Sequence, residues 1–235
     1  MNYMEYKLSY DTWGKEELQV FKQIKKNQQL TMSKNTEVFE RSFSKQFKRR
    51  YSLMVNSGSS ANLLAVASLF YKKNKPLKRG DEVIVPAISW STTYSPLQQF
   101  GLKLKVIDAE KDSLNIDVNK ILKHISKKTK MIVGVSILGN PAKLEYIERI
   151  CKKNNIYFLN DNCESLGAKI GKKFTSSYGD LTTHSFFFSH HISTVEGGMV
   201  STDNFELYCI MNSLRTHGWT RNLPNNNPLT KKKLQ

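Results

Sequence analysis

The amino-acid sequence predicts a three-layer α/β fold with a mostly parallel β-sheet. Short runs rich in β-branched and aromatic residues alternate with segments whose apolar residues recur at helical spacing. The run 130–137 (KMIVGVSI) is almost wholly apolar and is expected in the centre of the sheet, where helices cover both faces of a strand. Polar candidate site residues follow several predicted strands, at the edge where such sheets bind ligands.

The first half of the chain is expected to begin with two lead-in helices, within about residues 1–50. Three strands and two further helices follow. The predicted elements are helices over 14–26 and 36–48, a strand over 51–55, a helix over 61–73, a strand over 81–86, a polar aromatic loop over 88–96, a strand over 102–107 and a helix over 117–125.

The second half continues the alternation. A turn at 138–141 follows the central strand, and we expect Asn140 to cap the next helix. Asp203 and Glu206 have the spacing of a capping box at the start of the last helix. The predicted elements are the strand 130–137, the helix 143–153, the strands 156–160, 185–188 and 199–202, and the helix 203–214.

Composition bounds the class of protein. The net charge is +16 (36 Lys and Arg minus 20 Asp and Glu), but the lysines are scattered rather than grouped with aromatic residues, so we expect no nucleic-acid partner. No apolar run approaches the roughly 20 residues of a membrane span, and the N-terminal residues lack the apolar core of a signal peptide. The three cysteines lack metal-ligand spacing and indicate a reducing compartment. We therefore expect a cytoplasmic protein without a metal site or a membrane partner.

The stretch 51–73 has the pattern of an anion site. A predicted strand, the small polar turn 56–60 (NSGSS) and a helix would direct free amides of the first helical turn and small hydroxyls toward one place. Small polar residues also begin many helices merely as caps. The pattern alone leaves both interpretations open.

The stretch 185–198 (SFFFSHHISTVEGG) has the features of an active-site loop. His190 and His191 are candidates for acid–base work or metal binding, although histidines beside aromatic residues are commonly packing residues. Adjacent residues of an extended segment point to opposite faces, so we expect at most one of the two to face a site. Gly197 and Gly198 are expected to supply the backbone freedom for a sharp reversal.

Two further residues have two interpretations each. Trp90 is either a core residue that caps the sheet or an aromatic surface for a ligand. Asp161 follows a predicted buried strand and is either a helix cap or a charge kept for a partner.

These motifs resemble, over about residues 10–221, the large domain of the DegT/StrS family of sugar aminotransferases. The resemblance implies the aspartate-aminotransferase (fold type I) architecture and the cofactor pyridoxal 5'-phosphate or pyridoxamine 5'-phosphate. It also implies that 1–235 is one large cofactor-binding domain and that the small C-terminal domain of the family has no counterpart here. A homodimer with shared active sites is expected.

The resemblance also implies the roles of individual residues. The positions that match the family's cofactor contacts are Gly58, Ser59, Ser60 and Ser185 for the phosphate, Trp90 for one face of the ring and Asp161 for the protonated ring nitrogen.

Two positions depart from the aminotransferase pattern. Most members carry a lysine six residues before the Glu of the Glu-Gly-Gly turn, and this lysine bonds covalently to the cofactor; here the position is His190. An imidazole forms no stable imine but can move a proton. Glu164, which the resemblance also implies as a cofactor contact, stands where aminotransferases usually have glutamine. Both departures resemble the family's 3-dehydratases of GDP- or CDP-linked 4-keto-6-deoxy sugars.

The resemblance therefore implies a pyridoxamine-phosphate-dependent 3-dehydratase of a nucleotide-linked 4-keto-6-deoxyhexose in deoxysugar and surface polysaccharide biosynthesis. His190 would move the proton that allows the C3 hydroxyl to leave. A cluster-dependent variant is disfavoured because no cysteine follows Cys209. The alternatives are a sugar aminotransferase of the same family and an inactive fragment or pseudoenzyme.

Overall fold

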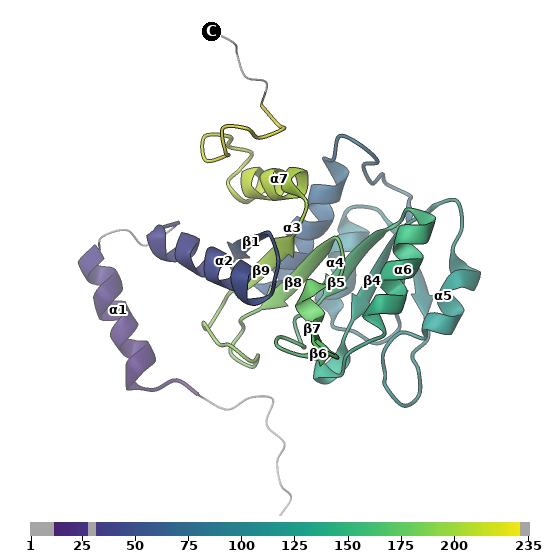
Figure 1. Cartoon of the computed structure of the whole chain (residues 1–235), viewed down its shortest axis with the longest axis horizontal. Helices are drawn as coiled ribbons and strands as arrows, with labels where there is room; N and C mark the ends of the chain where they lie inside the picture. The colour runs from purple at the N-terminus through teal and green to yellow at the C-terminus, as the bar shows by residue number, and fades with distance from the viewer. Residues whose placement is uncertain (1–11, 28–31, 231–235) are drawn as a thin grey trace, which may run out of the picture.

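The structure, a computed structural model, describes residues 12–27 and 32–230 (Figure 1). The elements before the centre of the sheet are α1 (Lys15–Asn27), α2 (Lys34–Gln46), β1 (Tyr51–Val55), α3 (Gly58–Phe70), β2 (Glu82–Pro86), α4 (Ser91–Gln99), β3 (Lys103–Ile107) and α5 (Val118–His124). Those that follow are β4 (Thr129–Val135), α6 (Leu144–Asn154), β5 (Tyr157–Asp161), β6 (Lys169–Ile170), β7 (Lys173–Phe174), β8 (Leu181–Ser185), β9 (Gly198–Thr202) and α7 (Phe205–Arg215), with short 3-10 turns at Ile137–Gly139 and Thr175–Ser177.

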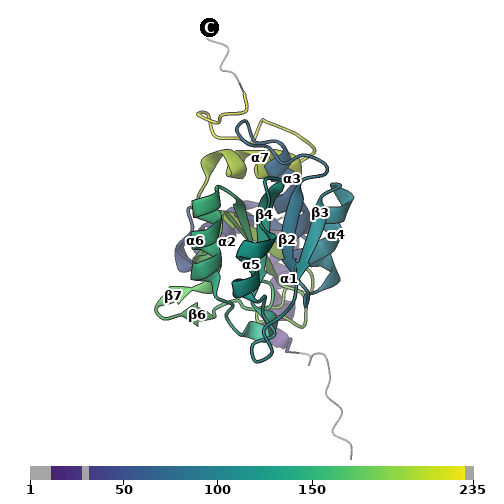
Figure 2. The same cartoon turned by 90° about the vertical axis from the view of Figure 1, so that its right-hand side faces the viewer.

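Seven strands form one mostly parallel sheet in the order β1-β9-β8-β5-β4-β2-β3. Strands β8, β5, β4, β2 and β3 run parallel, and β9 is antiparallel to both of its neighbours. The apolar run predicted for the centre is β4, which is paired on both edges and almost wholly buried. The small hairpin β6–β7 projects from the body below α6 (Figure 2).

Helices cover both faces, so the predicted three-layer α/β fold is confirmed. Successive strand residues point to opposite faces: Val83 and Val85 pack with α3, α4 and α7, whereas Ile84 packs with α5 and α6. A third apolar cluster joins α2 to the far end of the sheet through Phe43, Phe47, Phe186 and Met199. A separate apolar cluster therefore holds each helical layer against the sheet, and the third holds α2 against its end.

The predicted loop over 88–96 is wrong, because most of it belongs to α4. Pro96 lies inside this helix and cannot donate an N–H to the carbonyl four residues earlier. That carbonyl, on Thr92, instead accepts from Asn62 Nδ2 at 3.3 Å. A side chain of α3 thus supplies the hydrogen bond that the local sequence lacks.

The strand predicted over 185–188 ends at its first residue. Ser185 closes β8, and the chain then bends, so that Phe186 is buried and Phe188 is 43% exposed. Gly197 and Gly198 are required for space rather than for backbone freedom. A Cβ on Gly198 would lie 2.2 Å from the Ser57 carbonyl oxygen, and one on Gly197 would lie 2.4 Å from Thr194 Oγ1.

Both predicted helix caps are also wrong. Asn204, not Asp203, caps α7 by accepting from Leu207 N at 3.0 Å, and Asp203 instead accepts from Arg50 N at 2.7 Å. Helix α6 begins after Lys143, and the side-chain amide of Asn140 donates to the Ser113 carbonyl at 3.4 Å.

His184 makes the stability of the fold depend on pH. Its ring is fully buried between Phe43 and Phe47, and burial lowers its pKa to about 3. In the unfolded chain the imidazole would take up a proton near pH 6.5, whereas in the folded chain it stays neutral until about pH 3. The contribution of neutral His184 to the free energy of unfolding is therefore complete above pH 6.5 and is lost as the pH falls toward 3.

We expect His184→Phe to remove part of this dependence. Between pH 6.5 and 4.5 the free energy of unfolding of the wild type should fall by about 2–3 kcal/mol more than that of the variant. Urea titrations at several pH values measure the difference, with the exposed His124→Phe as the matched control. Equal slopes for His184→Phe and the wild type would contradict the assignment.

Candidate active site

The candidate residues meet at one edge of the sheet. Asp161 ends β5, Ser185 ends β8, and Gly58 begins the helix that follows β1. Val55 and Ser185 both pair with Gly198, on opposite sides of β9, which brings the ends of β1 and β8 together. The register of three strands therefore places the start of α3 beside Ser185.

Gly58 lies in close contact with Ser185 and Cys163. A Cβ on Gly58 would lie 2.6 Å from Ser185 Cβ and 3.0 Å from Cys163 Sγ. Ser57 caps α3, with its Oγ accepting from Ser60 N at 3.0 Å, while the first-turn amides of Gly58 and Ser59 have no partner within the helix. The start of α3 thus combines free amides with nearby hydroxyls, a suitable arrangement for an anion.

We expect Gly58→Ala to disturb this edge. Because the added methyl overlaps Ser185, the variant should lose about 1–3 kcal/mol of unfolding free energy and should bind inorganic phosphate or phosphate esters more weakly. Thermal unfolding and equilibrium dialysis measure both effects. Ser59→Ala, at the exposed next position, is the control for stability. An unchanged Gly58→Ala protein would show that the contact is not tight.

Asp161 is a buried carboxylate at the centre of the edge. It is 5% exposed, and no helix follows it, so the helix-cap interpretation is excluded. Its Oδ2 accepts from Asn62 Nδ2 at 2.8 Å and from Thr93 Oγ1 at 2.7 Å, and its Oδ1 accepts from Cys163 N at 3.3 Å. Burial, and then the negative charge of Asp161, raises the pKa of the Cys163 thiol, so this cysteine stays protonated at neutral pH.

Trp90 is a surface residue rather than a core residue. Its side chain is 67% exposed at the first position before α4, and its carbonyl accepts from Thr93 N at 3.0 Å. Since Thr93 also contacts Asp161, the start of α4 carries Trp90 to the same edge of the sheet. A large exposed aromatic ring is available there for stacking.

His190 lies half-buried in the bend after β8. Burial lowers its pKa, and His191 lowers it further, whereas the charges of Glu164 and Asp161 partly oppose the lowering. The imidazole is therefore neutral at pH 7 and near two carboxylates. His191 is exposed, and both histidines lie in a bend rather than in the extended strand expected from the sequence.

Glu164 is held by the turn after β4. Its Oε2 accepts from Leu138 N at 2.7 Å, at a residue whose φ of 51° is unusual for a non-glycine side chain. Gly139 follows with a φ of 81°, and a Cβ there would lie 3.4 Å from the Glu164 carbonyl oxygen. The turn that was expected to cap α6 thus fixes Glu164 instead.

Residues 11–233 match the DegT/DnrJ/EryC1/StrS aminotransferase family. The chain belongs to this family. Proteins named GDP-4-keto-6-deoxy-D-mannose 3-dehydratase are 48% identical to it over 230 residues in Yersinia pseudotuberculosis and 44% identical over 227 residues in Escherichia coli O55:H7. These matches cover 98% and 97% of this chain but 58% of each relative. The chain thus spans a little over half of the length of these relatives.

Two solved structures illustrate the shared fold. An E. coli GDP-4-keto-6-deoxy-D-mannose-3-dehydratase with bound hydrated PLP is 44% identical, with a TM-score of 0.90 over 95% of this chain and 57% of its own. The aminotransferase PseC of Helicobacter pylori gives a TM-score of 0.84 at 26% identity, over 99% of this chain and 59% of its own. The architecture expected from the family resemblance is therefore confirmed.

Sequence inspection missed the residues that hold Asp161. Asn62 and Thr93 are 2% and 3% exposed and bond to it from two different helices. Asn62 stands on a mostly apolar stretch of α3 (ANLLAVASLF), and an amide among apolar residues was an available signal. Thr93 lay in the stretch interpreted as a loop and gave none.

Two arginines near the end of the described chain, Arg215 and Arg221, have other partners. Arg215 forms a partly buried ion pair with Glu40 at 2.5 Å and donates to the Met54 carbonyl at 3.0 Å. Arg221 stacks on Trp219, with Cζ 4.0 Å from the ring centre. Arg215 therefore joins α7 to α2.

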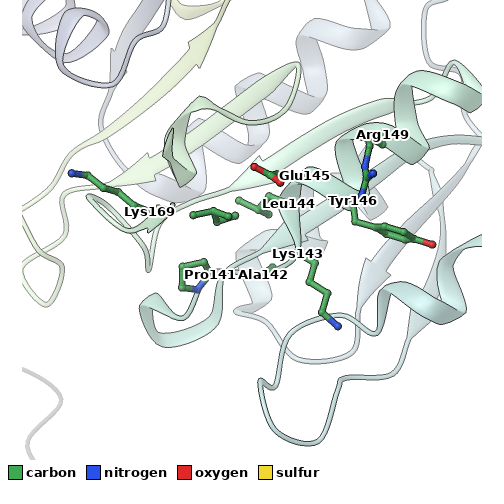
Figure 3. A pocket seen from close by; sticks show the side chains of 9 residues that line it. Pro141, Ala142, Lys143, Leu144, Glu145, Tyr146, Arg149 and Lys169 are labelled. Carbon is green, nitrogen blue, oxygen red and sulfur yellow. The ribbon is translucent and has the colours of Figure 1, made fainter. Parts of the chain in front are cut away.

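A cavity of about 490 Å³ lies away from the candidate residues, at the start of α6 beside the β6–β7 hairpin (Figure 3). Its cations already have partners: Lys143 pairs with Glu110 at 2.7 Å, and Arg149 lies over the ring of Tyr146. The candidate active site is the open sheet edge rather than this cavity. Among the described residues, no group of three or more His, Cys, Asp and Glu side chains could hold a metal, and no helix is long and apolar enough to cross a membrane.

Proposed function

We propose that this chain is the large domain of a pyridoxamine-phosphate-dependent 3-dehydratase that acts on a GDP-linked 4-keto-6-deoxyhexose. The observation that carries the proposal is His190, a half-buried imidazole in the bend after β8 whose lowered pKa keeps it neutral at pH 7. Identity of 48% and 44% to two proteins named as such dehydratases supports the same assignment and favours a GDP-mannose-derived substrate.

The residues at the sheet edge fit the cofactor. Gly58, which leaves no room for a Cβ, and the free first-turn amides of α3 suit a phosphate, together with the hydroxyls of Ser59, Ser60 and Ser185. We assign the protonated ring nitrogen to Asp161 and one ring face to Trp90. A structure of NtdA from Bacillus subtilis, 26% identical with a TM-score of 0.82, is described with bound PMP and supports this cofactor class.

The bound cofactor would supply an amine for the sugar ketone and a ring that accepts electrons. The task of this chain is to place proton-transfer groups around it. A ring nitrogen of His190, neutral at pH 7, would accept a proton and return it to the departing C3 hydroxyl, which would leave as water. Glu164, fixed by the Leu138 amide, supplies a negative charge beside the resulting imidazolium.

The proposal extends to the assembly and the location of the protein. We infer a homodimer, because large apolar side chains are exposed in the two loops that carry Trp90 and His190, namely Ile88, Phe188 and Ile192. A cytoplasmic location agrees with three unpaired cysteines in the described chain. A small C-terminal domain, as in the family, would complete the site.

The proposal predicts that the cofactor binds without a covalent bond to the protein. We expect pyridoxal phosphate to be removed by gel filtration, and treatment with borohydride before filtration to leave no pyridoxyl group on any lysine of the candidate site. Intact-mass measurement detects such a group. A lysine-containing aminotransferase of the family is the positive control, and a stable adduct on this protein would support the aminotransferase alternative.

A further inference from the structure

Two buried side chains donate hydrogen bonds to one carboxylate oxygen of Asp161. Asn62 Nδ2 and Thr93 Oγ1 both donate to Oδ2, at 2.8 Å and 2.7 Å, from helices α3 and α4. A carboxylate oxygen has two lone pairs, and these two donors use both of them. Oδ1 accepts from the Cys163 amide at the longer distance of 3.3 Å, and the Cys163 thiol also interacts with the carboxylate.

Each of the two donors is itself fixed. Thr183 Oγ1 donates to Asn62 Oδ1 at 2.7 Å, and Ser89 Oγ lies 2.8 Å from Thr93 Oγ1. An ionised carboxylate can only accept, so the Asn62 amide must present its nitrogen to Asp161. The carboxylate therefore has one orientation, set by buried groups on three sides.

Helix α3 contributes both to the proposed phosphate site and to the contacts of Asp161. Asn62 lies four residues after Gly58 on α3, which is about one helical turn, or roughly 6 Å along the axis. Helix α3 thus carries the phosphate-end amides at its first turn and the Asp161 contact at its second. The helix therefore fixes the distance between the proposed phosphate site and Asp161 independently of any ligand.

We propose that Asn62 and Thr93 are positioning residues that direct Asp161 Oδ1 to the cofactor ring nitrogen. The inference rests on the proposed function, in that it needs a pyridine ring beside Asp161. Neither residue needs to touch the cofactor. Replacing either residue should then change ligand affinity only through the orientation of Asp161. It should not change the affinity for a ligand that has no ring nitrogen.

The test compares two ligands on the complete protein: pyridoxal phosphate and its 1-deaza analogue, in which a C–H group replaces the ring nitrogen. Thr93→Val and Asn62→Leu should each weaken pyridoxal phosphate binding about 10-fold, the loss expected for one hydrogen bond to a charged group. Both variants should change the dissociation constant of the analogue less than about 2-fold, because the analogue has no ring nitrogen that could contact Asp161. Fluorescence titration gives the dissociation constants.

Two controls separate positioning from general damage. Thr182→Val removes a buried hydroxyl bond of 2.7 Å to the Tyr178 carbonyl, away from the Asp161 side chain, and should alter neither affinity. Thr93→Ser keeps the donor and should restore pyridoxal phosphate binding. If Asn62→Leu does not fold, Thr93→Val carries the test alone.

Equal weakening of both ligands, or of neither, would overturn the inference. A wild-type protein that binds the analogue as tightly as pyridoxal phosphate would remove the ring-nitrogen role of Asp161 and this inference with it. A wild-type protein that binds neither ligand would overturn the proposed function itself.

Discussion

Replacing His190 by lysine is expected to lower the rate of C3 deoxygenation by about 100- to 10,000-fold, the usual contribution of a general base. His190 is half-buried and has a lowered pKa, so it is neutral and ready to accept a proton at pH 7. A lysine there would either be protonated or react with the cofactor aldehyde. The rate is measured on the complete protein with a GDP-linked 4-keto-6-deoxy sugar.

His191→Ala is the matched control, since the neighbouring imidazole is exposed. We expect a loss of less than about 10-fold for this variant, well below the loss of a general base. If His191→Ala is the inactive variant and His190→Lys stays active, the role of the loop has been assigned to the wrong histidine.

The acid side of the pH–rate profile reports on the same group. The base must be neutral, and because the pKa of His190 is lowered from 6.5, the neutral form persists below that pH. The acid limb of kcat/KM should therefore lie below pH 6.5 and should be absent in the residual activity of the His190 variant.

Asp161→Asn is expected to lower turnover by about 100- to 1,000-fold and to weaken cofactor binding, as for the loss of a preorganised charge in an active site. Asn62 and Thr93 both donate to the Oδ2 position, so an asparagine at 161 must place its amide oxygen there. Its NH₂ group would then face the protonated ring nitrogen, with one donor opposing another. Binding is followed by the absorbance of pyridoxal phosphate.

A matched control exists one residue earlier. Asn160 is also buried at the end of β5, but its amide bonds to the Thr175 carbonyl at 2.8 Å, away from Asp161. Asn160→Ala should lower stability while leaving the affinity for pyridoxal phosphate per folded molecule unchanged. Full turnover of Asp161→Asn would show that this carboxylate has only a structural role.

The layers of the fold were predictable because the pattern of apolar residues depends on burial. Strand β4 is apolar on both faces since helices cover both, and the run 130–137 carries that signal directly. Helix α4 was not predictable in the same way. Its sequence, STTYSPLQQ, has a proline inside, and the missing backbone bond is replaced by Asn62, 30 residues earlier in the chain.

The candidate site was predictable as far as its residues follow strand ends. Gly58 and Asp161 were found after predicted strands, whereas Ser185 was expected to begin a strand and was found only through the family resemblance; the strand register brings all three to one edge. The contacts that orient them were not visible in sequence, because they join distant elements. The bond from Leu138 N to Glu164 and the grip of Asn62 on Asp161 depend on tertiary packing alone.

The glycine pair at the end of the loop illustrates the difference between finding a residue and explaining it. The sequence indicated a reversal at Gly197 and Gly198, but the reversal lies before them, because Gly198 begins β9 and the Gly197 carbonyl accepts from Phe186 N at 2.8 Å. Glycine is nevertheless required at both positions. The reason is the close approach of the Ser57 carbonyl and the Thr194 hydroxyl, which excludes any side chain. Space, unlike backbone conformation, is set by segments remote in sequence.

The most direct test of the account is the product formed from GDP-linked 4-keto-6-deoxymannose by the complete protein with pyridoxal phosphate and an amino donor. Mass spectrometry of the nucleotide sugar distinguishes the two chemistries. We expect a product that has lost the oxygen of its C3 hydroxyl and retains the C4 ketone, formed by the wild type and not by His190→Lys. A product that keeps the C3 hydroxyl and carries an amino group at C4 would contradict the account and establish an aminotransferase.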